Sequence, residues 1–250
     1  MERWLNRVAV VTGASSGIGA ACCKDLVAKG MIVVGLARRE ERLQELKASL
    51  PADQAKRFIG HKCDVSDEKH VIETFAWVDK NLGGADVLIN NAGIISETLI
   101  TSPNNSVDLR AILDTNVLGV SWCTREAFLS QQRRKVNDGH VVIINSILGH
   151  GVPFVEGFNF NLYGPSKYAL TAMTEVLRQE FQNKGTQTKI TSVSPGAVDT
   201  EIIPENVKKA VTVFPKLRSE DVADAVTYCI QTPPNVQIHE LTIKPIGEKF

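Results

Sequence analysis

Seven short, almost continuously apolar segments recur along the chain and alternate with segments of helical periodicity. The apolar segments are 7–12, 31–37, 57–63, 86–90, 140–145, 189–194 and 240–244. Strands that are apolar on both faces are typical of parallel sheets covered by helices on each side. Because neighbouring parallel strands need crossover helices, the alternation predicts an α/β fold with a doubly wound sheet of about seven mostly parallel strands.

The segments between these strands have the apolar spacing of helices. They are 17–29, 39–50, 66–81, a long one within 107–134, 163–183 and 219–230. Ser66 and Ser219 are each followed by acidic residues, so we predict them as N-caps. No Pro-, Gly- or Ser-rich linker divides the 250 residues, and we therefore expect a single domain over 1–250.

Charge and composition exclude several classes of function. The 28 basic and 28 acidic side chains cancel, so we expect neither nucleic acid nor anionic lipid as a partner. No run approaches the length of a membrane span, and the first ten residues are too charged for a signal peptide. The five cysteines show no metal-ligand spacing, which predicts no metal site and buried thiols in the cytoplasm.

A glycine-rich turn, "TGASSGIG", follows the first predicted strand. Gly13, Gly17 and Gly19 are spaced G-x-x-x-G-x-G, which differs from the common G-x-G-x-x-G fingerprint. Glycines there let the backbone turn tightly and let a pyrophosphate approach the start of the next helix. A plain tight turn is the alternative, and the position between a strand and a helix favours dinucleotide binding.

The residues after the second predicted strand favour NADP over NAD. The sequence "GLARRE" places Arg38 and Arg39 there, with no acidic residue before Glu40. A guanidinium suits a 2′-phosphate, whereas a carboxylate accepts the ribose hydroxyls of NAD. Two arginines at the start of a solvated helix, or an NAD-linked enzyme, remain alternatives.

Polar residues also follow the third and fourth strands. Asp64 could bond an adenine amino group or simply begin a turn. The "NNAG" segment, residues 90–93, would pass near the cofactor ribose. Asn90 itself is at least as well explained as a side chain that braces the strand.

Tyr163 and Lys167 stand at the mouth of a predicted helix, and Ser146 follows the fifth strand. Positions i and i+4 share a helix face, about 5–6 Å apart at Cβ. The pKa of a free tyrosine is near 10, so acid/base action near neutral pH needs a pKa lower by roughly three, which corresponds to about 4 kcal/mol. A unit charge at about 4 Å supplies that energy at an effective dielectric of ~20. We therefore predict that Lys167 lowers the pKa of Tyr163. Pro165 fits an early helical turn, where its missing N–H costs nothing.

With these motifs in order, the sequence resembles the short-chain dehydrogenase/reductase family from about Arg7 to Pro245. The family's motifs appear as the glycine turn, the NNAG segment, Asn116 in "DTNVLG", Ser146, the Tyr163/Lys167 pair and the loop "SPGAVDT". Gly164 and Pro165 replace the usual small residues within the Tyr/Lys motif. The resemblance implies a Rossmann-type fold and oxidoreduction with NADP(H). Shorter stretches such as "CTREAF" resemble animal SDR family member 11 proteins and insect farnesol dehydrogenases, which implies apolar alcohol or carbonyl substrates.

The resemblance also implies residue roles. Tyr163 would be the general acid/base, Lys167 would bind the nicotinamide ribose, Ser146 would orient the substrate oxygen, and Asn116 would hold a water that links Lys167 to solvent. The implied cofactor contacts are Gly13, Ser15, Ser16, Gly17, Ile18, Gly19, Arg38, Arg39, Asp64, Val65, Asn91, Ala92, Gly93, Tyr163, Lys167, Pro195, Gly196, Val198 and Thr200. A catalytically silent NADP(H)-binding sensor or scaffold of the same fold is the rival interpretation.

The expected substrate pocket comprises Ser146, His150, Phe154, Tyr163 and Ile202, with Phe158 and Phe160 as further candidates. A lid is expected at about 201–217, where apolar residues also suit the core of a short helix; they are Ile202, Ile203, Val207, Val211 and Phe214. The family's usual assembly predicts a homodimer or homotetramer formed through the helix at 163–183 and the long helix within 107–134.

Overall fold

The computed structural model describes residues 1–154, 159–202 and 215–248, and within them all seven predicted strands pair in one sheet. The strands are β1 (Val8–Thr12), β2 (Ile32–Ala37), β3 (Phe58–Lys62), β4 (Val87–Asn90), β5 (His140–Ile144), β6 (Lys189–Pro195) and β7 (Glu240–Ile243). Their order is β3-β2-β1-β4-β5-β6-β7, and every neighbouring pair is parallel. This is the strand order of a Rossmann-type sheet with one strand added, which confirms the predicted fold.

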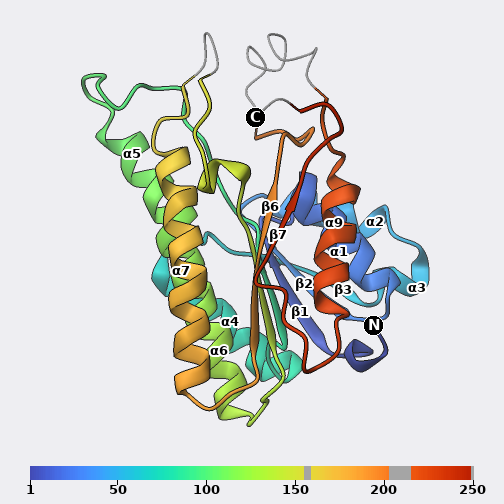
Figure 1. The fold of residues 1–250 in the computed structure, drawn as a ribbon. Helices are drawn as coiled ribbons and strands as arrows, with labels where there is room; N and C mark the ends of the chain where they lie inside the picture. The colour runs from blue at the N-terminus through green and yellow to red at the C-terminus, as the bar shows by residue number, and fades with distance from the viewer. Residues whose placement is uncertain (155–158, 203–214, 249–250) are drawn as a thin grey trace.

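Helices cover both faces of the sheet (Figure 1). The helices α4 (Glu68–Leu82), α5 (Ser106–Leu113), α6 (Gly119–Arg133) and α7 (Tyr163–Asn183) lie on one face. The other face carries α1 (Gly17–Ala28), α2 (Glu40–Ala48), α3 (Ala52–Ala55) and α9 (Ser219–Ile230). Three short segments complete the described helices: η1 (Glu2–Trp4), η2 (Asp114–Leu118) and η3 (Ile147–Gly149).

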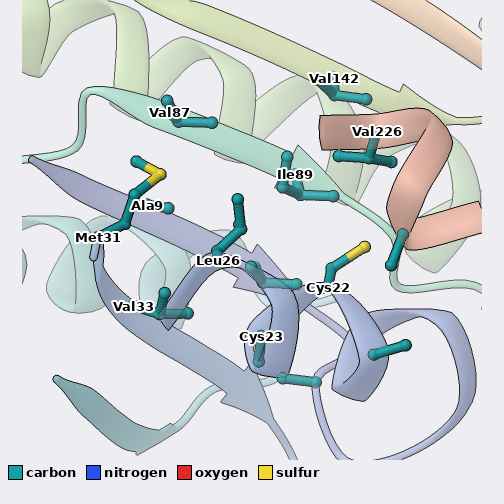
Figure 2. Close-up of a cluster of buried hydrophobic side chains, with 14 of the residues drawn as sticks. Ala9, Cys22, Cys23, Leu26, Met31, Val33, Val87, Ile89, Val142 and Val226 are labelled. Atoms are coloured by element: carbon teal, nitrogen blue, oxygen red, sulfur yellow. The ribbon is translucent and has the colours of Figure 1, made fainter. Parts of the chain in front are cut away.

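Each face of the sheet has its own apolar core because successive strand residues point to opposite sides. In β1, Ala9 and Val11 belong to the cluster under α1 and α9, whereas Val8 and Val10 belong to the cluster under α4, α6 and α7. Figure 2 shows the first cluster, in which Cys22 and Cys23 of α1 pack among aliphatic side chains. All five cysteines are buried free thiols, as predicted. No helix in the described ranges is long and apolar enough to span a bilayer.

The two predicted N-caps are wrong. The cap of α4 is Asp67, whose carboxylate accepts hydrogen bonds from the backbone N–H of Lys69 and His70. Ser66 instead donates its hydroxyl hydrogen to Asp64. Ser219 is the first residue of α9, and Arg218 precedes it as the cap. A carboxylate is a stronger acceptor than a hydroxyl, so an adjacent Asp takes the capping position from Ser66.

The long helix predicted within 107–134 contains a change of geometry. Residues Asp114–Leu118 form a π-helical turn between α5 and α6. Such turns are rare and occur mostly as single insertions in α-helices, often at functional sites. Asn116 lies in this turn.

Candidate active site

A cavity of ≈ 380 Å³ opens at the carboxyl ends of β1 to β6. This edge is where ligands bind in doubly wound sheets, at the point where the strand order reverses. Here the reversal lies between β1 and β4. Of the residues predicted to contact a cofactor, all except Gly19 line this cavity.

The reversal point is held by hydrogen bonds between the glycine turn and the NNAG segment. The hydroxyl of Thr12 accepts from the backbone N–H of Asn91 and Ala92, at 2.9 and 3.0 Å. The Asn91 amide donates back to the carbonyls of Thr12 and Gly13. Asn91 is therefore a brace for the turn, and its backbone still lines the cavity.

The three glycines of the turn are required by sterics. Gly13 and Gly17 have φ values of +67° and +53°, which side chains rarely adopt. A Cβ on Gly19 would lie 2.4 Å from the carbonyl oxygen of Gly13, so Gly19 permits the close packing of α1 on the turn. This packing role explains why Gly19 does not line the cavity itself.

The start of α1 fits a pyrophosphate. Ser16 precedes the helix without a side-chain capping bond in the described structure, and Gly17 and Ile18 line the cavity. The first N–H groups of a helix have no partner within the helix and attract anions. The turn and helix start therefore fit a dinucleotide.

The rim beyond β2 carries the predicted arginines. Arg38 and Arg39 both line the cavity. The Arg39 guanidinium lies 3.0 Å from the Ser15 hydroxyl and also contacts Glu201. Arg39 thus joins the glycine turn to the segment after Thr200.

The alternatives left open at Asp64 and Asn90 now have structural partners. The Asp64 carboxylate accepts from both the backbone N–H and the hydroxyl of Ser66, so it forms a turn while it and Val65 border the cavity. Asn90 is buried and donates to Thr124 on α6, which supports its bracing role.

Ser146, Tyr163 and Lys167 all line the cavity. The helix α7 begins at Tyr163, as predicted, which puts Pro165 in the first turn, where it displaces no hydrogen bond. The ammonium of Lys167 lies 5.5 Å from the centroid of the Tyr163 ring and donates to the Ile144 carbonyl at 2.9 Å. The i, i+4 spacing therefore brings the two side chains to one face.

Asn161 sets the entry to this helix, and sequence reasoning missed it. Its backbone is left-handed, with φ +46°. Its side-chain amide donates to the carbonyl and hydroxyl of Thr98, and its oxygen accepts from the Leu162 N–H. Asn tolerates this conformation better than most residues, and that preference is the only signal in the sequence.

Burial shifts the pKa of both functional groups. Burial raises the pKa of Tyr163 to about 12, and a hydrogen bond with Ser146 opposes this shift. Burial lowers the pKa of Lys167 to about 8. The direction at Tyr163 is opposite to the one we predicted from the lysine charge. Removal of the phenol from water disfavours its ionised form, and the Ser146 hydrogen bond offsets only part of this cost.

Asn116 lies behind the cavity and does not line it. Its side-chain oxygen accepts from the Ile94 N–H at 2.9 Å. Its amide donates to the Ile94 carbonyl and to Ser166, which is one residue before Lys167. The side chain therefore ties the segment after β4 to α7.

The loop after β6 is supported by Glu248. Pro195, Gly196, Val198 and Thr200 line the cavity, and the Ala197 N–H donates to the Glu248 carboxylate at 3.1 Å. A Cβ on Gly196 would lie 2.1 Å from the Glu248 carboxylate, so a larger residue there would displace this carboxylate from its present position. Nothing in the local sequence indicates this contact, because the partners are 51 residues apart.

Two residues predicted for the substrate pocket do not line the cavity. The His150 ring points to Glu240 on β7, at 2.5 Å, and Phe154 is 89% exposed. An acidic partner on the neighbouring strand holds the imidazole away from the cavity. Pro153, Phe160 and Ile202 do line it, whereas Phe158 and most of the expected lid, 203–214, lie outside the described residues. In the described part of the chain no group of His, Cys, Asp or Glu could hold a metal ion.

The chain is similar in sequence to known proteins. A family model described as short chain dehydrogenase matches residues 7–210. A farnesol dehydrogenase of Aedes aegypti is 52% identical, with 100% of both chains covered. The SDR family member 11 of Bos taurus is 41% identical over 98% of each chain.

Solved structures of dehydrogenases have a similar fold. A closed serine dehydrogenase complexed with NADP⁺ superposes with a TM-score of 0.85 at 28% identity, over 97% of this chain and 96% of the other. An alcohol dehydrogenase from Thermococcus sibiricus complexed with 5-hydroxy-NADP gives 0.81 at 26%, over 97% and 98%. The strand order, the glycine turn and the helix with Tyr163 and Lys167 agree with these matches. The chain therefore belongs to the short-chain dehydrogenase family.

Proposed function

We propose that the protein is an NADP(H)-dependent oxidoreductase that interconverts an apolar alcohol and its aldehyde or ketone. The observation that carries this proposal is the convergence of Ser146, Tyr163 and Lys167 on one cavity that also contains the glycine turn. The NADP-bound structural neighbours and the arginines after β2 support the choice of cofactor. The NADPH nicotinamide would supply a hydride to the carbonyl carbon.

The chain's own residues then bind the substrate oxygen and supply the proton that it takes up. Ser146 donates a hydrogen bond to the substrate oxygen, and Tyr163 gives its phenolic proton to that oxygen as the alcohol forms. A pKa of about 12 keeps Tyr163 protonated before the reaction. Lys167, cationic below about pH 8, stabilises the phenolate that remains and binds the ribose hydroxyls. Asn116 is proposed to hold the water through which Tyr163 is reprotonated.

The substrate class follows from the apolar part of the lining. Phe160, Pro153 and Ile202 line the same cavity as Tyr163. Apolar walls with a few placed polar groups are typical of small-molecule sites. Together with the resemblance to a farnesol dehydrogenase, they support isoprenoid, steroid or dicarbonyl substrates. We retain 201–217 as the proposed lid.

The test compares NADPH oxidation by the wild type and by Tyr163→Phe, with farnesal and with a steroid ketone. We expect kcat/KM to fall by about 10²–10⁴-fold, because the acid is lost. The matched control is Tyr168→Phe, an exposed tyrosine on the same helix, which should retain activity. Equal rates for the Tyr163 variant would exclude the assignment. Cofactor binding without turnover on a broad carbonyl panel would favour a silent sensor.

We also propose that the protein is a homodimer or homotetramer assembled through α7 and the α5–α6 helix. Large apolar side chains are exposed on these helices, at Val107, Leu118 and Val176. Exposed apolar side chains on these helices are candidates for burial in such an interface. Light scattering at micromolar concentration should give a multiple of 27.3 kDa. A monomer mass would rule this assembly out.

The proposed location is the cytoplasm. Five buried free thiols support a reducing compartment, where such thiols persist. Imaging of the tagged protein in its own cell would test this.

A further inference from the structure

A three-residue ionic cluster occupies the rim of the cavity beyond β2. Both carboxylate oxygens of Glu201 accept from the Arg42 guanidinium at 2.6 Å. The same carboxylate accepts from Arg39 at 3.4 and 3.5 Å. Glu201 is 159 residues from Arg42, so the contact is a product of the fold.

The cluster coincides with the position where a dinucleotide fold distinguishes its two cofactors. Arg39 follows β2, where a 2′-phosphate is recognised, and it lines the cavity with Glu201. A carboxylate and a phosphate present similar oxygen acceptors to a guanidinium. Glu201 therefore takes up the donors that a 2′-phosphate would use.

We propose that Glu201 is a specificity-determining residue that competes with the cofactor 2′-phosphate for Arg39. This inference rests on the proposed use of NADP(H). When the phosphate binds, Arg39 exchanges the carboxylate for phosphate oxygens, and Glu201 stays with Arg42. The affinity for the phosphorylated cofactor is then the difference between two interactions of anions with the same cation.

The geometry is suited to such an exchange. The distance from the Glu201 carboxylate to Arg39 is longer than its distance to Arg42. The contact with Arg39 is therefore the one that is given up. The side chains are exposed, at 43% for Arg39 and 53% for Glu201, and exposed ion pairs are weak. Arg42 holds the pKa of Glu201 below its usual value, so the group is a carboxylate at neutral pH. A bound phosphate would be repelled by that charge.

The experiment measures binding without turnover. Isothermal titration gives Kd for adenosine 2′,5′-bisphosphate and for adenosine 5′-monophosphate, with the wild type and with Glu201→Gln. The two probes differ only in the 2′-phosphate. We expect Glu201→Gln to tighten the bisphosphate by about three- to tenfold and to leave the monophosphate within about twofold. Glu73→Gln, at an exposed glutamate of α4, is the matched control and should change neither Kd.

The outcomes separate the two claims. Equal binding of the two probes, both by the wild type and by Glu201→Gln, would contradict the proposed NADP preference and this inference with it. A wild type that prefers the bisphosphate, with unchanged or weaker binding in Glu201→Gln, would overturn the competition alone, because the carboxylate would then organise the arginines. Equal tightening of both probes would also overturn it, since the effect would be general. Thermal unfolding of each variant verifies that it is folded.

Discussion

Two buried lysines lie at opposite ends of the neighbouring strands β5 and β6 and differ in how many hydrogen bonds their ammonium groups donate. Lys167 is 5% exposed at the cavity, and Lys189 is 3% exposed at the start of β6. Burial lowers the pKa of both to about 8. The Lys189 ammonium donates to the hydroxyl of Thr232 and to the carbonyls of Thr232, Pro233 and Val236. Within the described residues, Lys167 has one hydrogen-bond acceptor, the Ile144 carbonyl.

The difference separates a lysine whose donors are all used by the fold from one that we propose acts in catalysis. An ammonium has three donors, and a buried donor without a partner costs free energy. Lys189 has all its donors satisfied and fixes the turn that leads into β7. Lys167 keeps donors available beside a cavity. A shifted pKa alone therefore does not distinguish the two lysines, whereas the unused donors of Lys167 beside a cavity make it the candidate.

The largest expected effect is on activity in Lys167→Met. We expect kcat/KM to fall by roughly 10²–10⁴-fold, since Tyr163 loses its cationic neighbour. A lowered lysine pKa contributes stability that is present above pH 10.5 and lost as the pH falls through about 8. At pH 7 the buried charge thus costs on the order of 3 kcal/mol. The free energy of unfolding, from urea titration, should be unchanged or higher by up to about 2 kcal/mol. A large loss of stability would contradict the claim that the fold does not depend on the Lys167 ammonium.

Lys189→Met should show the reverse. The buried Thr232 would lose its donor, whereas the Pro233 and Val236 carbonyls belong to exposed residues, so we expect the free energy of unfolding to fall by about 1–3 kcal/mol. Activity per folded molecule should stay within a few-fold of the wild type. Urea titration and an activity assay on the same sample measure both quantities. Loss of activity in the still folded variant would remove the distinction between the two lysines.

His140 lies opposite Lys189 in the paired strands β5 and β6, so it offers a further test of how burial shifts the pKa of a structural group. Burial, with the charges of Lys189 and Arg3, lowers the pKa of His140 to about 3. Its contribution to stability is present above pH 6.5 and lost as the pH falls toward 3. Between pH 6.5 and 4.5 the wild type should lose about 2 kcal/mol from this group. His140→Gln should lose correspondingly less over that range in urea titrations. Parallel curves for both proteins would contradict the shift.

The smallest effect is expected at a lysine that is only partly buried. Lys29 pairs with Asp25 at 2.6 Å, in i, i+4 spacing on α1, and its side chain is 34% exposed. Exposed pairs contribute little because water screens both charges. Lys29→Met should change the free energy of unfolding by less than about 0.5 kcal/mol. A larger change would show that burial is not what distinguishes the three lysines.

The sequence predicts the sheet well because its strands are apolar on both faces. All seven predicted strands agree with the structure to within one residue at each end. The helix at 163–183 also begins and ends where predicted. The motif residues lie at strand ends, and the topology alone brings such ends together.

The remaining features depend on contacts between distant or exposed residues. The pairing of Arg42 with Glu201 and the support of Ala197 by Glu248 have no local signal. His150 was expected in the pocket, but Glu240, on a strand 90 residues away, attracts its ring. The direction of the Tyr163 pKa shift was wrong because a two-charge argument leaves out the burial of the phenol itself.

The π-helical turn at Asp114–Leu118 limits which deletions the chain can tolerate. Removing one residue there would restore regular α-helical winding and rotate everything beyond it by about 100°. The face of α6 that carries Val120, Cys123 and Ala127 into the core would then turn away from the sheet. Asn116 would lose its register with Ser166 at the same time. The number of residues in this helix therefore fixes both the packing of α6 and the position of Asn116. Related proteins of different length should place their insertions outside this helix.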